Sequence, residues 1–152
     1  MKALSVRQPW ANLIVHGIKD VENRSRRTNF RGRILIHSPK IEDKEPNIIS
    51  LPDRVRSLMS FIEENSTVDM SQVEYVNFLH KTWGPIWDVQ HKSAVIGSVE
   101  IVDCIDDSSS VWSDFGSWHW ILKDPILFDK PILGVKGNLG LWNYDLPEGY
   151  NA

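Results

Sequence analysis

Cys104 is the only cysteine in the 152-residue sequence. A single thiol excludes an intrachain disulfide and a cysteine-rich zinc site. No apolar run approaches the ~18 residues that a membrane-spanning helix needs, and the first five residues lack the apolar core of a signal peptide. We therefore expect a cytoplasmic protein without a membrane partner. The net charge of −3 argues against a polycation that coats nucleic acid with its whole surface.

Several motif classes are also missing. The sequence has no Walker phosphate loop, no dinucleotide-binding glycine fingerprint and no serine-hydrolase elbow. Its five histidines show no metal-ligand spacing, and we interpret His37 and His119 as strand residues rather than as ligands. We accordingly expect neither a cofactor nor a metal site.

Charged residues are unevenly distributed along the chain. Residues 17–37 carry six basic and two acidic side chains, whereas residues 41–78 carry three basic and eight acidic ones. This pattern predicts one basic face and one acidic segment. Seven tryptophans are many for this length, so stacking surfaces are expected as well.

The hydrophobic pattern predicts a single domain over residues 1–152. Strands are expected over residues 3–7, 33–37, 94–104, 118–122, 125–128 and 133–136, with a short helix between the first two. Gly97 indicates a bend, a bulge or a close backbone approach in its strand. An insertion at about residues 41–90 is expected to hold helices over 52–65 and 71–79. We predict an α+β fold, a small and partly closed β-barrel. In it, strands 3–7, 33–37, 94–104 and 133–136 share one curved sheet, and Trp142 closes one end.

The most informative stretch runs from Arg7 to Arg24. Trp10 opens an apolar helical turn, and the run from Gly17 to Arg24 has the pattern G-x-K-x-x-E-x-R. Gly17 is expected to end the helix in the left-handed conformation. In the extended segment that follows, Lys19, Val21 and Asn23 should share one face, and Glu22 and Arg24 the other. These residues form either one wall of a pocket for a planar polar ligand or a plain surface ion pair.

Three blocks of sequence carry a family resemblance. They are residues 4–11 (LSVRQPWA), the G-x-K-x-x-E-x-R run with residues 30–37 (FRGRILIH), and residues 131–142, which include VKGNLGLW. Together they resemble the ASCH domain, the activating signal cointegrator homology domain of the PUA-like superfamily. The resemblance implies a PUA-like barrel and leaves the middle of the chain unmatched.

The resemblance also implies two kinds of activity. Bacterial N4-acetylcytidine amidohydrolases with this fold use a lysine, a threonine and a glutamate, and other members are described as ribonucleases that act through the motif lysine. Lys19 matches the lysine and Glu100 the strand glutamate, whereas Glu22 stands where those enzymes have threonine. A carboxylate cannot replace a hydroxyl in the same role. If the protein is an enzyme, its catalytic residues are therefore Lys19, Glu22 and Glu100.

Binding without turnover fits the same stretch and is the interpretation we favour. Glu22 can accept a hydrogen bond from the exocyclic amine of cytosine, and Trp10 can stack on a base. The expected partner is RNA or a modified nucleoside, with DNA left open, and a protein-interaction module is a third alternative. The expected ligand-binding residues are Arg7, Gln8, Trp10, Lys19, Glu22 and Arg24. The residues expected to hold the phosphate backbone are Arg26, Arg27, Arg31 and Arg33.

Overall fold

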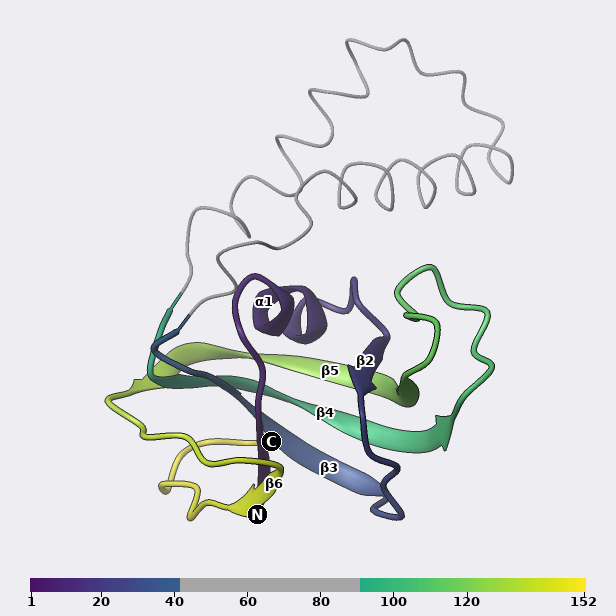
Figure 1. Ribbon diagram of the computed structural model, residues 1–152. Coiled ribbons are helices and arrows are strands. Elements are labelled where there is room, and N and C mark those ends of the chain that lie inside the picture. The colour runs from purple at the N-terminus through teal and green to yellow at the C-terminus, as the bar shows by residue number, and fades with distance from the viewer. Residues whose placement is uncertain (42–90) are drawn as a thin grey trace, which may run out of the picture. The chain divides into compact units, whose positions relative to one another are not determined.

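The computed structural model describes residues 1–41 and 91–152, which make up nearly all of one compact unit, Met1–Asp43 with Gln90–Ala152. The helices expected over 52–65 and 71–79 lie outside the described residues. Within the described residues, six strands form one curled sheet in the order β2-β5-β4-β3-β1-β6 (Figure 1). The elements are β1 (Lys2–Ser5), α1 (Trp10–Val15), β2 (Val21–Arg24), β3 (Gly32–Ser38), β4 (Ala94–Ile105), β5 (Trp118–Leu133) and β6 (Leu141–Asn143).

The sheet curls so that its two sides approach each other. β1 pairs with β3 in parallel and with β6 antiparallel, and β2 pairs with β5. β2 and β6 end the strand order, so the sheet is open between them. A hydrogen bond of 2.8 Å from Arg24 Nη2, on β2, to the Ser5 carbonyl, on β1, crosses this opening. The expectation of a small, partly closed barrel therefore agrees with a curled, open sheet.

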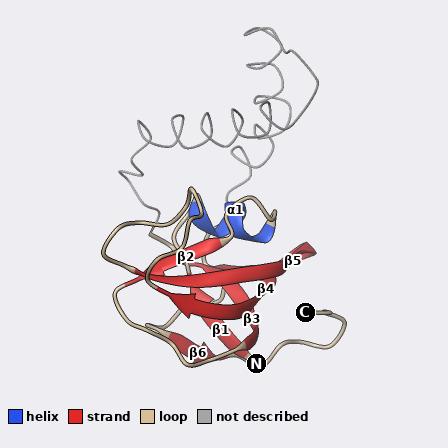
Figure 2. Ribbon diagram, turned by 90° about the vertical axis from the view of Figure 1, so that its right-hand side faces the viewer, coloured by secondary structure: helices blue, strands red, loops and turns tan. Residues whose placement is uncertain are grey.

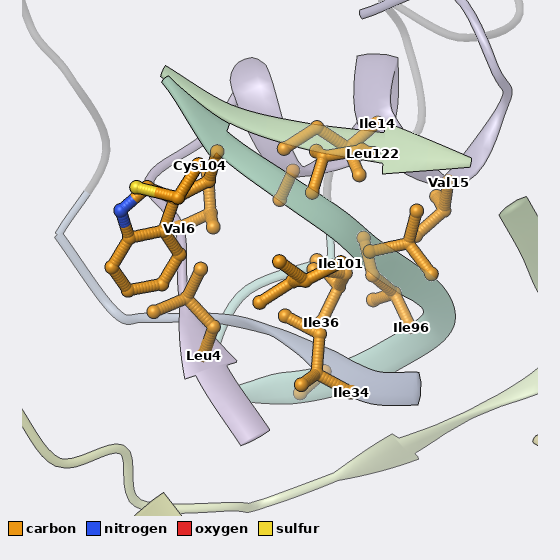
Figure 3. Close-up of a cluster of buried hydrophobic side chains, with 14 residues drawn as sticks. Leu4, Val6, Ile14, Val15, Ile34, Ile36, Ile96, Ile101, Cys104 and Leu122 are labelled. Carbon is orange, nitrogen blue, oxygen red and sulfur yellow. The ribbon is translucent and has the colours of Figure 1, made fainter. Parts of the chain in front are cut away.

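The core lies between the sheet and α1, which covers one face in Figure 2. Ile14, Ile34, Ile101 and Leu122 are among its buried side chains and gather in one cluster (Figure 3). Burying a side chain of this size contributes about 1.5–3 kcal/mol. A second cluster contains Trp142, which is 8% exposed.

Gly17 ends α1 in the manner expected, with φ of +76°. The Ile18 N–H donates to the Leu13 carbonyl at 2.9 Å and the Gly17 N–H to the Ile14 carbonyl at 3.0 Å. This is the hydrogen-bond pattern of a Schellman motif, which favours glycine at the left-handed position. The Lys19 N–H shares the Leu13 carbonyl at 3.0 Å, so the chain is fixed just before β2 begins.

Gly97 marks both a bulge and a close approach, and this expectation is confirmed. The pairing of β4 with β5 shifts between Val95 and Gly97. A Cβ on Gly97 would lie 2.2 Å from the Ile126 carbonyl oxygen and 2.8 Å from a Val15 methyl. Only glycine lets α1 and β5 approach β4 this closely at that point.

Two strand predictions were wrong. Residues 118–122 and 125–128 belong to one long strand, β5, which continues through Asp124 at φ of +48°. Residues 133–136 form no strand of their own: Leu133 is the last residue of β5, and Gly134, at φ of +73°, turns the chain into a loop over residues 134–139. The alternating apolar residues there are typical of a strand, but Val135 is a buried residue of the loop. The strand that follows is β6, beside β1.

Candidate functional site

A cleft of about 1040 Å³ lies where several separate stretches of chain meet. Its walls come from the end of β1, the first residue of α1, β2, the end of β3 and the loop over residues 134–139. The cleft thus lies at the opening of the curled sheet, where Arg24 bridges β2 and β1.

Glu22 lines the cleft as the centre of a three-residue charge cluster. Its Oε2 accepts from Lys19 Nζ at 3.2 Å, and its Oε1 accepts from Arg24 Nε at 2.9 Å. The side chains of Lys19 and Glu22 are only 5% and 10% exposed. Lys19 Nζ also donates to the Val21 carbonyl. Because each carboxylate oxygen can accept two hydrogen bonds, Glu22 retains acceptor capacity for a ligand.

The sheet geometry explains how these residues meet. Glu22 and Arg24 share one face of β2, as predicted, and Asn23 points to the other side, where it bonds the Trp112 carbonyl and the Asp114 N–H. The prediction for Lys19 was wrong: it precedes β2, and its side chain reaches the Glu22 side. The Schellman turn, rather than strand alternation, sets its direction.

Trp10 forms an aromatic part of the wall. Its ring meets Trp112 edge-on, with centroids 6.4 Å apart and an interplanar angle of 71°. Trp112 is 1% exposed, and its carbonyl accepts from Asn23 Nδ2 at 2.8 Å. The indole of Trp10 therefore contacts a buried, hydrogen-bonded neighbour while it lines the cleft.

The lining of the cleft is basic, although the whole chain has a net charge of −3. Its cations are Arg7, Arg24, Lys40 and Lys136, and Glu22 is the only carboxylate among the described lining residues. Arg7, Lys40 and Lys136 are exposed and come from three separate segments. A cleft of this kind attracts anionic ligands.

Ser5 and His37 also line the cleft, and sequence analysis assigned no function to either. Ser5 Oγ lies 3.0 Å from His37 Nδ1, and His37 Nε2 lies 2.9 Å from the Val135 carbonyl oxygen. A carbonyl oxygen only accepts, so Nε2 carries the proton and Nδ1 of the neutral ring is an acceptor. Burial lowers the pKa of His37 from its ordinary value of 6.5, although the bond to Val135 acts in the opposite direction.

The structure does not bring the other predicted residues into the cleft. Gln8 is fully buried behind it, bonded to Asn12 and to the His91 carbonyl. Lys19 lies behind Glu22. Glu100, on β4, is paired in register with Arg33 and Lys123 and is not among the lining residues.

None of the four arginines expected to hold a phosphate backbone lines the cleft. Arg31 pairs with Asp103 at 3.1 Å, and Arg33 donates to Ser98 Oγ and to the Asp124 carbonyl. Arg27 lies over the Trp118 ring, 5.6 Å from its centroid, and Arg26 is exposed. Three of the four are therefore held in contacts within the chain, two of them through hydrogen bonds and Arg27 through the Trp118 ring.

Neither a metal centre nor a membrane span is found in the described part of the chain. Residues 1–41 and 91–152 contain no cluster of histidine, cysteine, aspartate or glutamate that could hold a metal ion. No helix in these segments is long and apolar enough to cross a membrane.

Comparison with known proteins confirms the resemblance to the ASCH domain; the match contains the first two sequence blocks and ends near the start of the third. The family model of the ASCH domain matches residues 4–132. Activating signal cointegrator 1 from Homo sapiens is 29% identical over 152 residues, which cover 93% of this chain and 22% of that protein. The protein of the same name from Mus musculus matches with the same identity and coverage. The chain thus spans 22% of the length of these relatives. Because the family model covers most of the chain, this protein belongs to the ASCH domain family.

Proposed function

We propose that the cleft binds one base of single-stranded nucleic acid, RNA in the first place, or a modified nucleoside. The observation that carries this proposal is the Glu22 carboxylate, held between Lys19 and Arg24 on the wall of a basic cleft. Such a fixed acceptor recognises an exocyclic amine. A cytosine presents its N4 amine to it, whereas a uracil presents a carbonyl oxygen that the carboxylate repels.

Stacking on Trp10 supplies affinity that does not depend on the base. A base on an aromatic side chain gains about 1–3 kcal/mol. The edge-on support from Trp112 limits the freedom of the Trp10 ring, so less entropy is lost when a ligand stacks on it.

The phosphates of the bound strand are assigned to Arg7, Lys40 and Lys136. These side chains line the cleft and are exposed. Arg26 and Arg27 extend the path outside it, while Arg31 and Arg33 contribute little because their guanidinium groups already bond within the chain.

Binding ranks above hydrolysis by the motif lysine. Lys19 is 5% exposed and donates to Glu22 and to the Val21 carbonyl, so its amine is a support for Glu22. Neither Lys19 nor Glu100 lines the cleft. The proposal also includes a cytoplasmic location and DNA as a ligand that competes with RNA.

Fluorescence anisotropy with short single-stranded oligocytidine and oligouridine RNAs tests this function. We expect Glu22→Gln to lower affinity for oligocytidine at least about tenfold, because a hydrogen bond to a charged group contributes about 1.5–3 kcal/mol. The same variant should bind oligouridine more tightly than the wild type, because the neutral amide no longer repels the uracil carbonyl. Glu100→Gln, the same change on a strand residue outside the cleft, should leave both affinities unaltered. Absence of any binding at low salt would refute the proposal, as would equal losses in the two variants.

A further inference from the structure

Ser5 and His37 have the geometry of a nucleophile and its base. The separation of 3.0 Å between Ser5 Oγ and His37 Nδ1 is within hydrogen-bond reach. The Val135 carbonyl holds the Nε2 proton and thereby presents the unprotonated Nδ1 to the hydroxyl. Nucleophile, base and orienting group are thus all present.

Ser5 is partly exposed at the cleft, whereas His37 beside it is only 1% exposed. Ser5 and His37 both line the cleft, and the loop passes them at Gly137. A Cβ on Gly137 would lie 2.6 Å from Ser5 Oγ and 2.7 Å from His37 Nδ1, so a side chain at that position would collide with both atoms, and only glycine lets the loop pack this closely against the pair. The Ser5 hydroxyl also has the Asn138 carbonyl within 3.2 Å, and its proton reaches Nδ1 when the hydroxyl rotates away from that oxygen.

Arg24 supplies positive charge at the same place. It uses Nε for Glu22 and Nη2 for the Ser5 carbonyl, at 2.9 and 2.8 Å. Its Nη1 has no hydrogen bond with the described residues and belongs to a side chain that lines the cleft. A donor beside the nucleophile is what an oxyanion requires during acyl transfer.

We propose that Ser5 and His37 form an acyl-transfer pair that hydrolyses a carboxylic ester carried on a ribose hydroxyl of a nucleotide. The choice of substrate rests on the proposed function, because the base would occupy the Glu22 wall and the phosphate would meet the basic lining. The ester class follows from the hydroxyl nucleophile and the base beside it.

The reaction balances without a further reagent. Ser5 Oγ bonds to the acyl carbon while its proton passes to His37 Nδ1, and the ribose oxygen leaves with that proton. Water then attacks the acyl-serine and gives a proton to Nδ1, which returns it to Ser5 Oγ as the carboxylic acid departs.

A serine-reactive fluorophosphonate and the small ester p-nitrophenyl acetate test the pair without any nucleobase. We expect mass spectrometry of the labelled wild-type chain to place the adduct on Ser5. We expect Ser5→Ala and His37→Gln to lower ester hydrolysis about 100-fold or more, as removal of a general base does. Ser25→Ala, which alters a cleft serine without a histidine beside it, should hydrolyse the ester like the wild type. A cytidine monophosphate acetylated on its ribose should be deacylated by the wild type and spared by Ser5→Ala.

Labelling of the wild-type chain tests the Ser5–His37 pair even if a variant fails to fold. An adduct absent from Ser5, or a hydrolysis rate equal in the wild type and Ser5→Ala, refutes the pair. RNA binding that persists in either case leaves the proposed function standing. An adduct on Ser5 without RNA binding refutes the proposed function and the ribose substrate while retaining the pair.

Discussion

Replacing Lys19 by methionine should destabilise the fold through Glu22. Lys19→Met keeps most of the side-chain volume but removes the donor to Glu22 Oε2 and to the Val21 carbonyl. The two side chains are 5% and 10% exposed, so Glu22 would keep a buried charge with one of its two partners missing. Breaking a buried pair in this way costs about 3–5 kcal/mol. Arg24 still bonds Oε1, so we expect the lower end, about 3 kcal/mol.

The chain offers a matched control in the Arg31–Asp103 pair. Its N···O distance of 3.1 Å is close to the 3.2 Å of Lys19–Glu22, but its side chains are 38% and 57% exposed. An exposed pair contributes about 0–1 kcal/mol, so Arg31→Met should have a small effect. Burial, rather than distance, then accounts for the difference between the two variants.

Urea denaturation, monitored by tryptophan fluorescence, measures the stability of both variants. With an m-value of about 2 kcal/mol/M, the midpoint for Lys19→Met should fall by about 1.5 M. The double variant Lys19→Met/Glu22→Leu should recover part of this loss, because no unpaired carboxylate remains. Equal midpoint shifts for Lys19→Met and Arg31→Met would refute the reasoning. A double variant less stable than Lys19→Met alone would refute it as well.

Three further outcomes are expected. Gly97→Ala should lower the free energy of unfolding by about 3 kcal/mol, because its Cβ would lie 2.2 Å from the Ile126 carbonyl oxygen; a variant with wild-type thermal stability contradicts this. Burial lowers the pKa of His37, so the unfolded chain binds more protons and stability should fall as the pH drops below 6.5. In thermal melts, the stability of His37→Gln should fall less steeply over that pH range, and a pH profile equal to that of the wild type would contradict this prediction. Lys136→Ala should flatten the salt slope of RNA binding by about 0.7, the value for one single-strand phosphate contact, whereas Arg33→Ala should leave it unaltered.

The local part of the site could be predicted from the sequence. A glycine after a short apolar helix implies a left-handed end, and Gly17 has that conformation. Alternation along an extended segment places Glu22 and Arg24 on one face, where they bond to each other. Both inferences use interactions between residues close in the chain, which the sequence encodes directly.

The long-range part could not be predicted in this way. Ser5 and Asn138 are 133 residues apart, and the Val135 carbonyl reaches His37 across 98. The sequence around Gly137 does not indicate what this glycine approaches, because the need for it arises from the Ser5 and His37 side chains on β1 and β3. Arg31 and Arg33 likewise gave a pattern typical of a phosphate-binding face, and only the fold shows their contacts with Asp103 and Ser98.

Because the cleft lies at the opening of the sheet, ligand binding is coupled to the contacts that hold β2 and β1 together across this opening. Arg24 bonds Glu22 on its own strand and the Ser5 carbonyl on β1, and its guanidinium lies 6.0 Å from the Trp120 ring centroid. The same side chain therefore fixes the proposed base acceptor, the proposed nucleophile and the approach of β2 to β1. A ligand that bonds Glu22 in the cleft adds to the interactions that hold this opening together, and by linkage it must raise the stability of the folded state.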